Sequence, residues 1–129
     1  GGGTALLRCI SVAENIAKTL SPDQAIGANI VVKSLKAPFI QILENAGIDD
    51  YYKYMSKVVQ SKDAFYGYNL RKDKFVNMLE DGIIDPTKVT RTAIENASSV
   101  GGTLLTLEAV VYNADADKEE TDNPLSNLI

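Results

Sequence analysis

The 129-residue sequence contains no histidine, and this absence removes several classes of site at once. Catalytic pairs built on histidine, histidine general bases and histidine metal ligands all need the missing imidazole. The single cysteine, Cys9, cannot form an internal disulfide, which is typical of a protein from a reducing compartment. The missing histidine therefore excludes histidine-based catalysis and histidine metal sites from this chain.

Long apolar runs and clusters of basic residues are also missing. No apolar stretch approaches the roughly 18–20 residues that span a bilayer, so we expect no membrane insertion. The net charge of −4 comes without a basic stripe, which argues against nucleic-acid binding because phosphate contacts need clustered Lys and Arg. The chain is 45% hydrophobic and 23% charged, which suffices for one compact domain with a core.

The first half of the sequence has the apolar spacing of helices that bury one face. One helix is predicted from after the glycines to Leu20. Ser21 and Pro22 favour the start of a second helix, and Gln24 is placed to complete a capping box. Pro38 is expected to end or kink that helix. The pattern then predicts a third helix that ends at Gly47 and a fourth that opens at Asp49 or Asp50 and carries apolar residues as far as Val59.

The second half alternates between aromatic, polar and helical patterns. The segment 64–69 is aromatic and contains glycine, which predicts a short strand or turn. A brief helix is expected from Lys72 to Asp81, with Gly82 ending it. Asp85 and Pro86 then open a long helix whose apolar spacing continues to Val111.

The end of the sequence is too polar to bury, because residues 115–122 are almost all charged. We therefore predict a domain over residues 1–113 and a flexible, disordered acidic tail over 114–129. The predicted fold class is all-α and multihelical, with one short strand or hairpin.

Three short segments carry residues suited to ligand contact, and each has an ordinary structural alternative. Gly1–Gly3 could approach an anion closely at a helix start, or form a plain turn. The Asn69 amide could meet the edge of a base, since it both donates and accepts, or it could cap its own turn. Asp85 would ordinarily be a helix cap.

One string in this sequence resembles a known family closely. Residues 82–93, GIIDPTKVTRTA, resemble the segment that opens the long C-terminal helix of group I chaperonins, the GroEL and Hsp60 family. The glycine start GGGTALLR is similar to the same family's glycine segment. Shorter matches follow in the family's order at near-matching spacing, over residues 1 to about 112: Gly27, Ala37-Pro38, Asn45-Ala46-Gly47, Tyr66-Gly67-Tyr68-Asn69, Val76-Asn77-Met78 and Glu108-Ala109-Val110-Val111.

The resemblance implies the C-terminal portion of an ATP-binding equatorial domain. It places Gly2 at the ribose, and Asn69, Leu70 and Arg71 at the adenine, although the family often has small residues after the asparagine. It also implies that Ile83 packs on the adenine face. Asp85 would accept hydrogen bonds from the ribose hydroxyls, which an ionised carboxylate can do.

The resemblance further implies that the intact subunit binds ATP and Mg²⁺ in seven-membered rings of chaperonin subunits, which enclose non-native polypeptides under a co-chaperonin. The family's phosphate-binding loop, metal-binding Asp and water-activating Asp correspond to sequence upstream of Gly1. We therefore expect this chain to contain no catalytic residue and no metal site, to bind no cofactor alone, and to lack ATPase and folding activity.

The segment Leu6–Ile10 leans toward a mitochondrial type and hence the mitochondrial matrix, with a plastid or the bacterial cytoplasm as alternatives. A rival hypothesis is a non-enzymatic helical interaction or scaffold module. Helices without their upstream half would expose apolar surface, so self-association, visible as a concentration-dependent size, is expected of the isolated chain.

Overall fold

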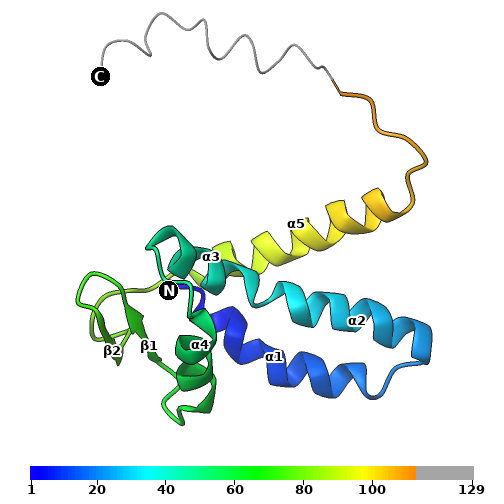
Figure 1. The fold of residues 1–129 in the computed structure, drawn as a ribbon. Helices are drawn as coiled ribbons and strands as arrows, with labels where there is room; N and C mark the ends of the chain where they lie inside the picture. The colour runs from blue at the N-terminus through cyan, green and yellow to red at the C-terminus, as the bar shows by residue number, and fades with distance from the viewer. Residues whose placement is uncertain (113–129) are drawn as a thin grey trace, which may run out of the picture. The chain divides into compact units, whose positions relative to one another are not determined.

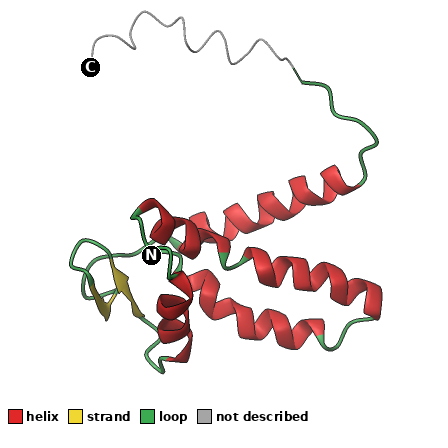
Figure 2. Cartoon of the chain, in the orientation of Figure 1, coloured by secondary structure: helices red, strands yellow, loops and turns green. Residues whose placement is uncertain are grey.

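The computed structural model describes residues 1–112, which form two compact units. The first covers residues 1–87 and the second begins at Lys88 (Figure 1). Helices make up most of the described chain (Figure 2). This confirms the predicted mostly helical fold with one short hairpin; the predicted tail at 114–129 lies outside the described residues. In order, the elements are α1 (Thr4–Ala17), α2 (Pro22–Ser34), α3 (Ala37–Asn45), α4 (Tyr51–Gln60), β1 (Tyr66–Asn69), β2 (Lys74–Asn77) and α5 (Thr87–Leu105).

The core of the first unit lies where α1 meets α3 and α4. Helix α2 runs back along α1, and α1 also contacts α3 and α4 (Figure 1). The side chains that close this core are fully or almost fully buried, and burying each Leu or Phe stabilises the fold by about 1.5–3 kcal/mol. They are Leu7, Ile10, Phe39, Leu43 and Val58.

Two predicted helix ends are confirmed in detail. The backbone N–H of Ser21 donates to Gln24 Oε1 at 3.3 Å, which is the reciprocal bond of the predicted capping box. Gly47 has a φ of 74°, and the next amide, that of Ile48, donates to the Leu43 carbonyl at 3.0 Å. This pattern ends α3 with a left-handed residue that glycine adopts without strain.

The break between α2 and α3 falls just before Pro38, as predicted. Pro38 stands in the first turn of α3, where its missing N–H costs nothing. The combined stretch Pro22–Asn45 is long and apolar enough, by length and composition alone, to cross a membrane. A single stretch of this kind is weak evidence for a membrane span; 22% of its most apolar window is buried, and α2 packs along α1.

The predicted helix from Lys72 to Asp81 is wrong. Residues 74–77 form β2, which pairs antiparallel with β1 in the register Tyr68↔Phe75 and Asn69↔Lys74. The Phe75 ring stacks on Tyr66 at 5.4 Å between centroids and lies 4.9 Å from Tyr68. Cross-strand aromatic pairs of this kind stabilise a hairpin, and here they outweigh the helical spacing of the apolar residues.

A single arginine connects α1 to the segment that leads into the hairpin. The guanidinium of Arg8 donates to the carbonyls of Ser61 and Tyr66, each at 3.3 Å, and to that of Asp63. These three carbonyls lie in a loop and the first residue of β1, where no helix ladder satisfies them. Arg8 therefore fixes where the hairpin starts relative to α1.

The helix of the second unit, α5, is shorter than predicted. It begins at Thr87 and ends at Leu105, so the prediction that it continues to Val111 is wrong. The Thr106 amide and hydroxyl both bond to the carbonyl of Thr103, which closes a tighter turn at the C-terminus. Such local hydroxyl bonds compete with helical continuation.

Candidate functional site

The glycine segment that precedes α1 lies against three other segments of the first unit. Gly2 and Gly3 have φ values of 62° and 73°, and the Thr4 hydroxyl donates to the Gly1 carbonyl at 2.7 Å. A Cβ on Gly1 would lie 2.6 Å from the carbonyl oxygen of Ile83, and one on Gly3 would lie 2.8 Å from the Phe39 backbone. Side chains are therefore excluded here, because only glycine permits both the conformation and the close approach.

The chain returns to this glycine segment immediately after the hairpin. The Ile83 amide donates to the Met78 carbonyl at 2.8 Å, and Gly82, with a φ of 71°, makes the turn between them. Two residues later, the Asp85 carboxylate pairs with the charged terminal amino group of this chain, with Oδ2 at 3.8 Å from the Gly1 nitrogen, and 55% of the Asp85 side chain is exposed. The structure thus brings Asp85, Ile83 and the glycines together, although they are more than 80 residues apart in sequence.

Met78 connects the glycine segment to the hairpin. Its side chain is 3% exposed, and a Cβ on Gly2 would lie 2.9 Å from its Cε. A Cβ on Gly67, in β1, would lie 2.5 Å from Met78 Cγ and 2.9 Å from a methyl carbon of Thr4. The hairpin and the glycine segment therefore both pack against the buried Met78 side chain.

Asn69 at the end of β1 is buried, and its side-chain amide makes three hydrogen bonds. Its Oδ1 accepts hydrogen bonds from the backbone N–H groups of Arg71, at 2.9 Å, and Lys72, at 3.2 Å. Its Nδ2 donates to Asp81 Oδ2 at 2.7 Å. The structure thus contains the turn cap, while the contact of Asn69 with a base stays a prediction. Leu70, half-buried, and Arg71, exposed, follow in the same turn.

Asp81 belongs to this cluster and was missed by the sequence analysis. Its Oδ1 accepts from Lys72 Nζ at 2.8 Å, and its side chain is 17% exposed. The hydrogen bonds from Lys72 and then from Asn69 hold the pKa of the Asp81 carboxyl below its ordinary value of 3.8. Its place within an expected helix hid this role, and only its position one residue before Gly82 hinted at a turn.

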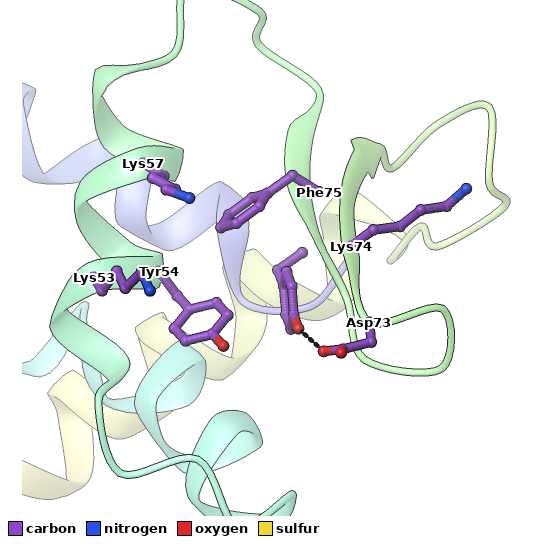
Figure 3. A pocket seen from close by; sticks show the side chains of 7 residues that line it. Lys53, Tyr54, Lys57, Asp73, Lys74 and Phe75 are labelled. Carbon is purple, nitrogen blue, oxygen red and sulfur yellow. Dashed lines mark hydrogen bonds between the residues drawn. The ribbon is translucent and has the colours of Figure 1, made fainter.

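A separate hollow of about 350 Å³ opens between α4 and the hairpin (Figure 3). The Lys57 ammonium lies 4.9 Å from the centre of the Phe75 ring, and the Tyr68 hydroxyl donates to Asp73. That hydrogen bond and burial raise the pKa of Tyr68. The other residues that line it are Lys53, Tyr54 and Lys74.

None of the predicted ligand-contacting residues lines this hollow, nor a second one of about 390 Å³ beside α3. Within residues 1–112 no group of three metal-ligating side chains occurs. The geometry that matches the sequence prediction is the exposed Asp85 carboxylate beside the glycine segment, and not an enclosed cavity.

The sequence matches the TCP-1/cpn60 chaperonin family over residues 1–115. The chain belongs to the TCP-1/cpn60 chaperonin family. Among solved structures, the fold is similar to the open-state monomer of a group II chaperonin from Methanococcoides burtonii, with a TM-score of 0.75 and 22% identity over 83% of this chain. It is also similar to a group III chaperonin in the open state, with a TM-score of 0.75 and 28% identity over 86% of this chain.

This chaperonin chain spans about a quarter of the length of those two structures, 27% and 23% respectively. The predicted family is therefore confirmed, while membership of group I stays a prediction, because these neighbours belong to groups II and III. The ligand contacts expected of Gly2, Asn69, Leu70, Arg71, Ile83 and Asp85 also stay predictions, now with defined positions.

Proposed function

We propose that this chain is the C-terminal part of the ATP-binding equatorial domain of a group I chaperonin subunit, and that it supplies the nucleoside half of the ATP site. The observation that carries the proposal is the close packing of the glycine segment on the segment that leads to Asp85, because a Cβ on Gly1 would lie 2.6 Å from the Ile83 carbonyl oxygen. Two segments that the family resemblance assigns to one ligand are adjacent in space.

The residues present fit the sugar of a nucleotide. An ionised carboxylate accepts hydrogen bonds from two vicinal hydroxyls at once, and Asp85 is exposed enough to meet them. Gly2 has no side chain to hold a ribose away. Ile83, which is half-buried next to Gly1, offers an apolar surface for the flat face of a base.

The edge of the adenine base is assigned to Asn69 and to the backbone of the turn that follows β1. The Asn69 amide oxygen accepts two hydrogen bonds and its nitrogen donates one to Asp81, and the second N–H of that nitrogen is the donor that we assign to adenine. The Arg71 N–H is used in the same network. The remaining backbone groups of Leu70 and Arg71 are the ones we assign to adenine.

The intact subunit would bind ATP with Mg²⁺ and work in a ring of seven subunits, with non-native polypeptides and a co-chaperonin as partners of its other domains. ATP supplies the phosphoryl chemistry, whose phosphate and metal ligands this account assigns to other parts of the subunit. The GIIDPTKVTRTA string supports group I, and the Leu6–Ile10 segment supports the mitochondrial matrix.

The test of the site is Asp85→Ala in the full-length subunit, with ATP affinity measured by calorimetry. We expect affinity to fall at least tenfold, since hydrogen bonds to a charged group contribute about 1.5–3 kcal/mol. Asp23→Ala, at an exposed carboxylate in the first turn of α2, is the matched control and should leave affinity unchanged. Unchanged affinity in Asp85→Ala would favour the rival, a non-enzymatic helical interaction module.

The group assignment has its own test, which does not depend on the site. Electron microscopy of the assembled full-length protein should show rings with sevenfold symmetry. A different number of subunits per ring would overturn group I and leave the chaperonin family in place.

A further inference from the structure

We propose that Asp81 is a positioning residue that locks the Asn69 turn to the segment carrying Ile83 and Asp85. The inference rests on the proposed nucleotide site, and it assigns a role to a residue outside the set that the sequence predicted. Its basis is the chain of hydrogen bonds from the turn through Asn69 to Asp81.

The residues at the two ends of this hydrogen-bond network belong to different parts of the site. Asn69 closes β1 and caps the turn of Leu70 and Arg71, whereas Asp81 stands two residues before Ile83. The Asn69 Nδ2 to Asp81 Oδ2 bond, at 2.7 Å, crosses directly between them. Asn69 is 5% exposed, so this bond is shielded from competing water.

Asp81 also sets the orientation of the Asn69 amide. With its oxygen toward the Arg71 and Lys72 N–H groups, the amide presents its NH₂ group to the carboxylate. A flipped amide would place NH₂ against two donors and its oxygen against an anion, and both contacts would be repulsive. The carboxylate therefore keeps the capped turn in one conformation.

Lys72 contributes to the network in two ways that can be separated. Its backbone N–H donates a hydrogen bond to Asn69 Oδ1. Its side-chain ammonium forms an ion pair with Asp81, and that side chain is 51% exposed. An exposed ion pair of this kind adds little. Removing the Lys72 ammonium should therefore lower ATP affinity much less than removing the Asp81 carboxylate.

The experiment compares Asp81→Ala, Lys72→Met and Asp85→Ala in the full-length subunit, with ATP, inosine triphosphate and inorganic tripolyphosphate as probes. For Asp81→Ala we expect about a tenfold loss of ATP affinity, about 1.4 kcal/mol. Because inosine changes the base edge that the turn contacts, the preference for ATP over inosine triphosphate should shrink, while tripolyphosphate affinity stays constant. Lys72→Met should stay within about twofold for all three probes.

A swapped pair keeps the inference testable if Asp81→Ala does not assemble. Asn69→Asp alone retains the turn cap but sets two carboxylates against each other, so the ATP preference should fall. Combining Asn69→Asp with Asp81→Asn restores one donor facing one acceptor and leaves the net charge of the protein unchanged. The double variant should bind ATP with an affinity within about twofold of the wild type.

Four outcomes would overturn the inference. Equal losses for all three probes would mean a general structural role, and a swapped pair no better than Asn69→Asp would mean that the bond itself is irrelevant. Full ATP affinity in Asp81→Ala alongside a loss in Asp85→Ala would remove this inference and spare the proposed site. Full ATP affinity in Asp85→Ala would overturn both this inference and the proposed nucleotide site.

Discussion

At Gly3 the backbone has a φ of 73°, and a side chain would meet the Phe39 backbone at 2.8 Å. Both effects oppose alanine, since the left-handed conformation alone costs an L-residue about 1–2 kcal/mol. We predict that Gly3→Ala lowers the free energy of unfolding by at least that amount in chemical denaturation. Gly27→Ala is the control, because its Cβ meets nothing within 4 Å in α2, and it should stabilise by about 0.5–1 kcal/mol. Equal effects at both positions would contradict the packing described here.

Asp81 gives a pH dependence with a defined sign. Its pKa is lowered in the folded state by Lys72 and Asn69, so the folded protein favours the carboxylate. The stabilisation is fully present above the ordinary value of 3.8 and is lost as pH falls through the lower, folded value. The unfolding free energy of the wild type should therefore exceed that of Asp81→Asn at pH 6, and the difference should shrink as pH falls toward 3. A constant difference would mean that the Asp81 charge is not stabilised in the fold.

At this scale the sequence predicted single residues well where a local pattern decides them. Gly47 and the Ser21–Gln24 pair follow from rules that act over three or four residues. Asn69 was left open between two roles, because only the fold shows that its amide is already engaged. Asp81 could not be found, since its partner is 12 residues away.

At the scale of elements, Arg8 on α1 holds the entry to the hairpin through three carbonyls, including that of Tyr66. Arg8→Met keeps the apolar stem but removes every donor, so we expect a loss of about 1–3 kcal/mol in stability. Hydrogen exchange of the β1 amides should speed up more than exchange in α2. Lys18→Met, at an exposed residue just beyond the end of α1, is the control and should change neither. Unchanged protection of the β1 amides against hydrogen exchange in Arg8→Met would show that Arg8 does not hold the entry to the hairpin.

The hairpin shows where element prediction failed. The aromatic content of 64–69 correctly indicated a strand, but Phe75, Met78 and Leu79 have helical spacing and suggested a helix. The pairing with β1 decides the outcome, because the strand partner lies outside any local window. The long C-terminal helix was predicted correctly in type, but it begins at Thr87, one residue after the expected Pro86, and it ends about six residues before Val111.

Across the whole molecule, many large apolar side chains stay exposed. On α2, Ile26 and Ile30 are 63% and 56% exposed, and on α5 Val89 and Leu104 are 62% and 55% exposed. The chain spans only about a quarter of its solved relatives, so the rest of a subunit is the partner we expect for such surfaces. Self-association of the isolated chain stays a prediction. The sequence predicted the family and the exposure of apolar surface on the helices, but not which side chains would be exposed.

The central claim is that Asp85 and the glycine segment form one ribose-binding edge, and a thermodynamic cycle tests it most directly. ATP and 2′,3′-dideoxy-ATP are titrated into the full-length subunit and its Asp85→Ala variant. The account predicts that the wild type prefers ATP by tenfold or more, and that the variant binds both nucleotides with equal, weaker affinity. An ATP preference that survives intact in Asp85→Ala would contradict the account.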